Sequence, residues 1–161
     1  MVRAATQADA ESIAAILNPV IRNTAITFNA QERTASEIAE AIETVPCYLV
    51  VEEAGEVLGF ASYDQFRKGV GYARAMEHTI VLNDATHGRG AGRTLMAAVE
   101  AHARAAGIGS LWAGVSGENP NGVEFHTAVG FETIARLPKV GFKFGRWMDL
   151  VLMRKWLDPD P

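Results

Sequence analysis

The chain of 161 residues lacks several features that mark particular protein classes. Its single cysteine, Cys47, excludes an internal disulfide and favours a reducing, cytoplasmic compartment. The net charge of −4 leaves no basic excess, which argues against a nucleic-acid partner. Neither a leader segment nor an apolar run of membrane-spanning length is evident, so no membrane partner is expected.

What the chain does contain is a 48% share of hydrophobic residues, which predicts one domain over residues 1–161. Strand patterns cover residues 2–5, 48–53, 57–63, 72–82, 111–115, 131–137 and 147–153. Helical patterns cover a segment capped by Thr6 and kinked or ended near Pro19, and residues 36–44, 94–106 and 120–129. This order predicts an α+β (mixed α/β) domain around one sheet, with Ile26 and Phe28 as buried anchors in a loop and Gly141 in the last connection.

The most informative segment is His87-Gly88-Arg89-Gly90-Ala91-Gly92-Arg93, which lies between a strand pattern and a helical one. Alternating glycines let several backbone N–H groups converge on one anion, and the positive end of the helix dipole adds to the attraction. The segment therefore predicts a pyrophosphate site, with a glycine-rich turn that binds nothing as the alternative. Its mid-chain position disfavours a dinucleotide-binding Rossmann unit, and no Gly-Lys-Ser/Thr follows, which excludes a P-loop.

These residues resemble the acyl-coenzyme A loop of the GCN5-related N-acetyltransferase superfamily, Gln/Arg-x-x-Gly-x-Gly/Ala, with His87 in the first position. Most of the chain is similar to the phosphinothricin / methionine sulfoximine N-acetyltransferase subfamily. That resemblance rests on residues 23–28, 66–67, 76–79, 118–119, 126, 130–131 and 140–150. One departure is Gly122, where related proteins carry a serine.

The resemblance implies a central, mostly antiparallel, twisted sheet with helices on both faces and strands splayed at the acyl-CoA site. It also implies acetyl-CoA as co-substrate, a small amino-acid-like substrate and a homodimer whose interface includes residues 141–150. The implied cofactor-binding residues are Ile80, Val81, Leu82, Gly88, Arg89, Gly90, Ala91, Gly92, Arg93 and Asn119. The N–H of Val81 or Leu82 is the expected donor to the tetrahedral oxyanion.

Two side chains are candidates for catalysis. Acetyl transfer to an amine requires that an ammonium first lose a proton, and Glu77 matches the family's proposed catalytic glutamate. Because Glu77 lies in a largely apolar strand, it needs either a partner or a wet cleft. His126 matches a family histidine near the thioester, where it is either a general acid for the thiolate or a hydrogen-bonded structural residue. The other histidines show no ligand-like spacing, so no metal is expected.

Four residues are candidates for substrate binding. Arg67 and Lys68 offer cations to the acidic groups of an amino-acid substrate, and in the family Arg67 borders the substrate site. Arg74 lies on the opposite strand face from Glu77 unless a bulge intervenes. Phe28 either packs over the substrate or is an ordinary core aromatic.

The expected function is thus acetyl-CoA-dependent N-acetylation of a small substrate such as phosphinothricin, methionine sulfoximine or methionine sulfone. Two alternatives remain open. One is acetylation of another amine, such as a protein N-terminus or a polyamine, and the other is a non-catalytic acyl-CoA-binding regulatory module.

Overall fold

The structure, a computed structural model, describes residues 1–159 and is built around one seven-stranded sheet in the order β1-β2-β3-β4-β5-β7-β6. The strands are β1 (Val2–Ala4), β2 (Cys47–Glu53), β3 (Glu56–Gln65), β4 (Ala75–Leu82), β5 (Ser110–Ser116), β6 (Glu132–Lys143) and β7 (Arg146–Trp156). All neighbouring strands run antiparallel except β4 and β5. The predicted α+β class and the mostly antiparallel sheet are confirmed.

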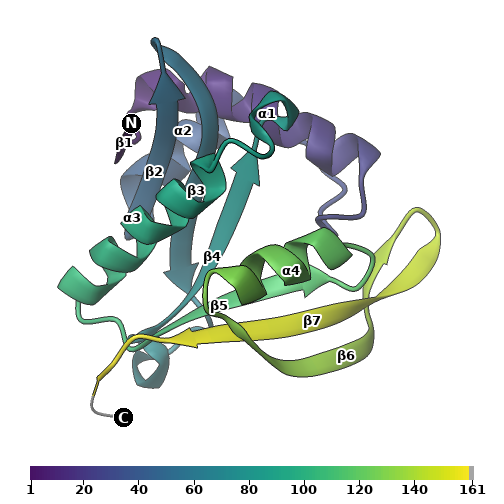
Figure 1. The fold of residues 1–161 in the computed structure, drawn as a ribbon. Coiled ribbons are helices and arrows are strands. Elements are labelled where there is room, and N and C mark those ends of the chain that lie inside the picture. The colour runs from purple at the N-terminus through teal and green to yellow at the C-terminus, as the bar shows by residue number, and fades with distance from the viewer. Residues whose placement is uncertain (160–161) are drawn as a thin grey trace.

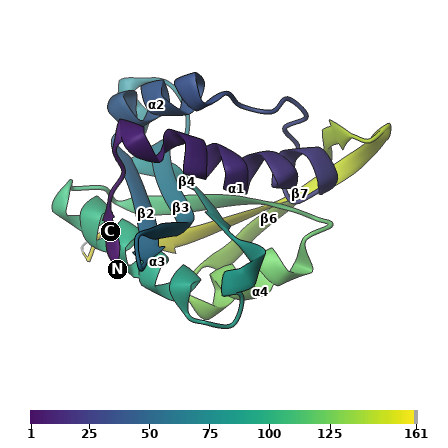
Figure 2. The ribbon, with the colours of Figure 1, turned by 90° about the horizontal axis from the view of Figure 1, so that it is seen from above.

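Helices cover both faces of the sheet, as predicted (Figure 2). Helices α1 (Ala10–Asn23) and α2 (Ala35–Thr44) lie on one face, and α3 (Ala91–Ala105) and α4 (Pro120–Ala128) lie on the other. Ile13, Ile38 and Phe60 of β3 belong to one buried apolar cluster, whereas Leu95 of α3 and Leu111 of β5 belong to a second. Burial of these apolar stripes on opposite sheet faces fixes the three-layer arrangement.

The feature that shapes the middle of the sheet is a divergence of its two parallel strands. Pairing of β4 with β5 runs only from Ala75–Ser110 to Glu77–Trp112. Beyond that point β4 continues along β3 and β5 continues along β7. Figure 1 shows the two strands separating from a common end, which confirms the predicted splay.

Helix α1 ends at Asn23, one turn past Pro19, because that turn buries Ile21 in the core, and a kink at the proline stays a prediction. Two predicted boundaries are wrong. The strand expected from residue 72 begins at Ala75, because Val70–Tyr72 forms a short 3₁₀ turn. In the last hairpin Gly141 belongs to strand β6 rather than to the connection.

Ile26, expected to be a buried anchor, is 49% exposed, so this expectation is wrong.

Within residues 1–159, no helix has the length and apolar character needed to cross a membrane.

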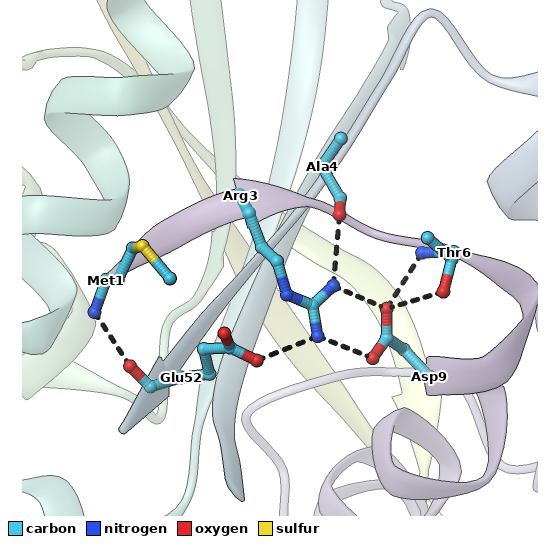
Figure 3. A network of polar contacts seen from close by, with 6 residues as sticks. All are labelled: Met1, Arg3, Ala4, Thr6, Asp9 and Glu52. Atoms are coloured by element: carbon cyan, nitrogen blue, oxygen red, sulfur yellow. Dashed lines mark hydrogen bonds and ion pairs between the residues drawn. The ribbon is translucent and has the colours of Figure 1, made fainter. Parts of the chain in front are cut away.

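A network of charged side chains ties the first strand to the start of the helical layer (Figure 3). Arg3 of β1 donates to both carboxylate oxygens of Asp9 at 2.9 Å, and to Glu52 of β2 at 2.9 Å. Asp9 also accepts the backbone N–H of Thr6 at 2.8 Å, which closes a capping box at the helix entry. The Arg3 hydrogen bonds lower the pKa of Asp9 from 3.8 to about 2.

Replacing Asp9 with asparagine is expected to lower the free energy of unfolding by about 1–2 kcal/mol near neutral pH. Because the pKa of Asp9 is lower in the folded state, the wild-type advantage is present above about pH 4 and is lost as the pH falls toward about 2. Urea unfolding across this range measures the effect. Glu11→Gln, which neutralises an exposed carboxylate on α1, is the control and should stay within about 0.5 kcal/mol of wild type. A wild-type advantage that does not shrink on acidification contradicts the prediction.

Candidate active site

A cleft of about 370 Å³ opens where β4 and β5 diverge. Its lining comes from both faces of the sheet. Leu17 of α1 and Phe28 of the α1–α2 loop (residues 24–34) line one side, and Asn119 and His126 line the other. The cleft therefore passes through the sheet, so that two ligands can approach one another from opposite faces.

Glu77 lines this cleft at the last paired position of β4. Desolvation in the cleft raises the pKa of its carboxyl above the usual 4.5 of a glutamate. Among the residues that the structure describes, none donates a hydrogen bond to this carboxylate. Gly114 of β5 makes room for it, since a Cβ there would lie 3.1 Å from Glu77 Oε2. The sequence predicts either a polar partner or a wet cleft for Glu77, and the structure shows the cleft.

The edge of β4 that faces the gap carries unpaired backbone groups. The amide of Asn83 donates to Leu58 and that of Phe66 to Ala75, so odd-numbered residues of β4 turn their backbone groups toward β3. Ile80 and Leu82 consequently turn theirs toward the gap. Of the two expected oxyanion donors, strand alternation leaves Leu82, because the amide of Val81 faces β3.

The glycine loop runs directly into α3, which begins at Ala91 rather than at the predicted residue 94. The amides of Ala91, Gly92 and Arg93 therefore belong to the first helical turn, where no intrahelical acceptor exists. Gly88 and Gly90 both have φ of +80°, and a Cβ on either would meet nothing within 4 Å. Free amides, a helix N-terminus and open space above the glycines together fit a diphosphate.

Two further cofactor candidates have contacts within the protein. Asn119 caps α4, and its side-chain oxygen accepts the amide of Gly122 at 3.0 Å. A Cβ on Gly122 would lie 2.4 Å from Asn119 Nδ2, so the serine of related proteins does not fit this side-chain position. The Arg89 guanidinium forms an ion pair with Glu53, and the Arg89 amide donates to the carbonyl oxygen of Thr86 at 3.2 Å, so both parts of this residue are engaged within the protein.

His126 forms a buried pair with His78. Its Nδ1 lies 2.7 Å from the carbonyl oxygen of Gly122, which only accepts, so we assign the ring proton to Nδ1. His126 Nε2 is then the acceptor for His78 Nε2–H at 2.9 Å. Burial lowers the pKa of His78 to about 3 and also lowers that of His126, so both rings are neutral at pH 7. With both nitrogens engaged, His126 fits the structural alternative and not the predicted general acid.

The four substrate candidates do not converge. Phe28 lines the cleft, whereas Arg67, Lys68 and Arg74 are absent from its lining among residues 1–159. Arg67 stacks over Tyr72 in the exposed loop after β3, with 5.8 Å between the guanidinium carbon and the ring centroid. The expectation for Arg74 is corrected, because it precedes β4 and binds the Gly107 carbonyl and Asp158 beside a separate pocket.

Sequence reasoning missed two residues near the cleft. His78 has no metal-ligand spacing, but strand alternation after Glu77 directs it to the α4 face, where it meets His126. Lys143 is buried between two exposed aromatic residues, and that alternation was the available signal.

Among residues 1–159, no cluster of three or more His, Cys, Asp or Glu side chains converges as metal ligands do.

Comparisons with known proteins agree with this geometry. A family model described as "Acetyltransferase (GNAT) domain" matches residues 2–152. The L-methionine sulfoximine/L-methionine sulfone acetyltransferase of Pseudomonas paraeruginosa is 36% identical over 163 residues, which cover 98% of this chain and 95% of that protein.

Two solved structures are also similar. The acetyltransferase yncA of Salmonella typhimurium, solved with acetyl-CoA, has a TM-score of 0.95 and 32% identity, with 100% of this chain and 95% of that chain covered. The ribosomal-protein-alanine N-acetyltransferase of Brucella melitensis has a TM-score of 0.93 and 34% identity, with 98% and 99% covered. The chain belongs to the GNAT family of acetyltransferases.

Proposed function

We propose that this protein transfers the acetyl group of acetyl-CoA to the amine of a small amino-acid-like substrate, of the methionine sulfoximine, methionine sulfone or phosphinothricin type. The observation that carries the proposal is the Glu77 carboxylate in a cleft that passes through the sheet beside an unpaired strand edge. The similar Pseudomonas enzyme acts on methionine sulfoximine and methionine sulfone, which supports this substrate class.

In the proposed mechanism the acetyl thioester enters beside β4. Within residues 88–93, the amides that have no acceptor in the protein, those of Gly88 and residues 90–93, bind the diphosphate. The backbone groups of Ile80 and Leu82 pair with the pantetheine arm. Asn119, at the start of α4, contacts the same arm. These contacts place the thioester carbonyl between the diverging strands, close to the Leu82 amide.

The amine approaches from the α1 face, where Phe28 and Glu77 line the cleft. Glu77 takes one proton from the ammonium, and the freed amine attacks the thioester carbon. The oxyanion that forms accepts a hydrogen bond from the Leu82 amide. The carbon–sulfur bond then breaks, and the second proton of the attacking nitrogen passes to the sulfur, so that coenzyme A leaves as the thiol. Glu77 returns the first proton to solvent, which is the one proton released overall. Arg67 and Lys68 remain candidates to attract the acidic end of the substrate.

Glu77→Gln is expected to lower kcat by at least about 100-fold with methionine sulfone, because the substitution removes the base. Thiol release from acetyl-CoA measures the rate. Since burial raises the pKa of Glu77, wild-type kcat/KM should fall on acidification at a pH above the usual glutamate range, and this limb should vanish in the variant. The matched control is Asp64→Asn. This substitution removes the exposed carboxylate that lies on β3 at the register position opposite Glu77. Equal rates for wild type and Glu77→Gln would remove the base assignment.

Gly90→Ala is expected to raise the Kd for coenzyme A at least about tenfold, measured by calorimetry, because a side chain disfavours the positive φ that aims the loop amides. Gly107→Ala is the control at the other end of α3. Its φ is +75° and its Cβ also meets nothing within 4 Å, so both variants lose about 1 kcal/mol of stability. Equal affinities in the two variants would place the diphosphate elsewhere.

The substrate class is decided by a direct comparison of amines. Methionine sulfone, methionine sulfoximine and phosphinothricin are assayed beside spermidine and a peptide with N-terminal alanine, the latter because of the similarity to the Brucella enzyme. Highest kcat/KM on one of the first three supports the proposal. Preference for the peptide or the polyamine favours another amine, and binding of acetyl-CoA without turnover of any amine favours a regulatory module.

We also propose a homodimer in a reducing, cytoplasmic compartment. The dimer is supported by an apolar face on the β6–β7 hairpin, where Val140, Phe142 and Trp147 are 50–59% exposed. The compartment is supported by the single cysteine, Cys47. Phe142 and Trp147 form an edge-to-face pair with 5.1 Å between ring centroids. Sedimentation velocity is expected to give a dimer for the wild type and a monomer for Trp147→Glu, because a charge on this face opposes its burial. A monomeric wild type contradicts the proposal.

A further inference from the structure

The most unusual polar group of the structure is the ammonium of Lys143 at the end of β6. The residue is 3% exposed, and Lys143 Nζ donates to the carbonyl oxygens of Ile21, Thr24 and Thr27 at 2.6, 2.7 and 2.8 Å. The three donors of the ammonium are therefore all used. Among residues 1–159 no carboxylate contacts this ammonium, and desolvation lowers its pKa.

The three acceptors explain why a cation is tolerated here. Ile21 lies in the last turn of α1, where carbonyl oxygens lack intrahelical donors and the helix dipole is negative. Thr24 and Thr27 belong to the α1–α2 loop. One side chain from β6 thus fixes the end of a helix and the loop that follows it, across more than 110 positions of sequence.

The other polar bonds of this part of the loop are local. Thr24 Oγ1 donates to the carbonyl of Val20, and the amides of Ile26 and Asn29 donate to the hydroxyls of Thr24 and Thr27. Such short-range turns shape a loop but do not attach it to the rest of the fold. The attachment to the sheet comes from Lys143.

A second contact reinforces the first. A Cβ on Gly141 would lie 2.4 Å from Phe28 Cδ2, so the Phe28 ring rests directly on the backbone of β6. Gly141 and Lys143 are two residues apart on one strand and face the same side. Strand β6 therefore holds the loop at two neighbouring points.

The segment held in this way lines the cleft. Ile26, Thr27, Phe28 and Asn29 are lining residues on the same side as Glu77. We propose that Lys143 is a positioning residue for the amine pocket: its ammonium holds residues 24–29 against β6 and so sets the shape of the wall that the amine substrate contacts. This inference rests on the proposed function in one respect, which is that the amine enters on this face.

The test compares substitutions of the buried Lys143 and of Lys155, whose side chain is 23% exposed. Lys143→Met keeps the length of the side chain and removes its donors. Lys155→Met is the matched control, because Lys155 of β7 also bonds a backbone carbonyl, that of Val129, and a carboxylate, that of Glu100, but on the α3–α4 side. Gly141→Ala displaces the Phe28 ring without removing a charge. If Lys143→Met does not fold, this second variant tests whether attachment of the loop to β6 shapes the amine pocket.

Lys143→Met is expected to raise the KM for methionine sulfone at least about tenfold while the KM for acetyl-CoA stays within about twofold. Gly141→Ala should give the same split, and Lys155→Met should give neither. Hydrogen exchange supplies a readout independent of turnover: the Ile26 and Asn29 amides should exchange at least about tenfold faster in Lys143→Met, with sheet amides unchanged.

The outcomes separate the two proposals. Failure of the wild type to acetylate any amine overturns the proposed function, and the exchange data still decide the role of Lys143. Two results overturn the positioning role of Lys143. One is a rate of amide hydrogen exchange in the loop that is the same in Lys143→Met and Lys155→Met. The other is a KM for the amine that is unchanged in both Lys143→Met and Gly141→Ala.

Discussion

The site depends on the point where β4 and β5 stop pairing, just after Glu77 and Trp112. Had the parallel ladder continued, the backbone groups of Ile80 and Leu82 would be used by β5, and no passage would cross the sheet. Each strand instead keeps its antiparallel partner, so the sheet retains its stability while one strand edge stays unpaired. An unpaired edge attracts another extended, amide-bearing chain, and the pantetheine arm of coenzyme A has that character.

The same divergence separates two chemical environments. Alternation along β4 directs Glu77 to the α1 face and His78 to the α4 face. The carboxylate faces a cleft that raises its pKa, whereas the histidine pair is buried and neutral. A carboxylate thus lies in the cleft on the α1 face, and a neutral hydrogen-bonded pair lies on the α4 face. The β6–β7 hairpin contacts Phe28 through Gly141 on one face and exposes Phe142 and Trp147 on the other.

Local sequence patterns predicted the parts of this arrangement that local chemistry determines. Glu77 in an apolar strand indicated a cleft, which the structure shows. The alternating glycines before α3 adopt the positive φ that they permit, and the anion site that they indicate stays a prediction. The pairing of His78 with His126 joins residues 48 positions apart, and no local pattern encodes it. Lys143 was missed for the same reason, because its acceptors are backbone carbonyls at the end of a distant helix.

The errors have physical causes as well. Arg74 was assigned to a strand that begins one residue later, and its guanidinium is held by Asp158 and Gly107. Pro19 was expected to disturb or end α1, but burial of Ile21 and the Lys143 bond to its carbonyl stabilise the turn that follows. Tertiary contacts override local propensity at both positions.

The most direct measurement of the central claim is an amide NMR titration with coenzyme A. The account predicts large shifts for the amides of residues 88–93 and an alternating response along β4, with Ile80 and Leu82 perturbed more than Thr79 and Val81, whose amides face β3. Shifts confined to other surfaces, or a response of β4 without alternation, would contradict it.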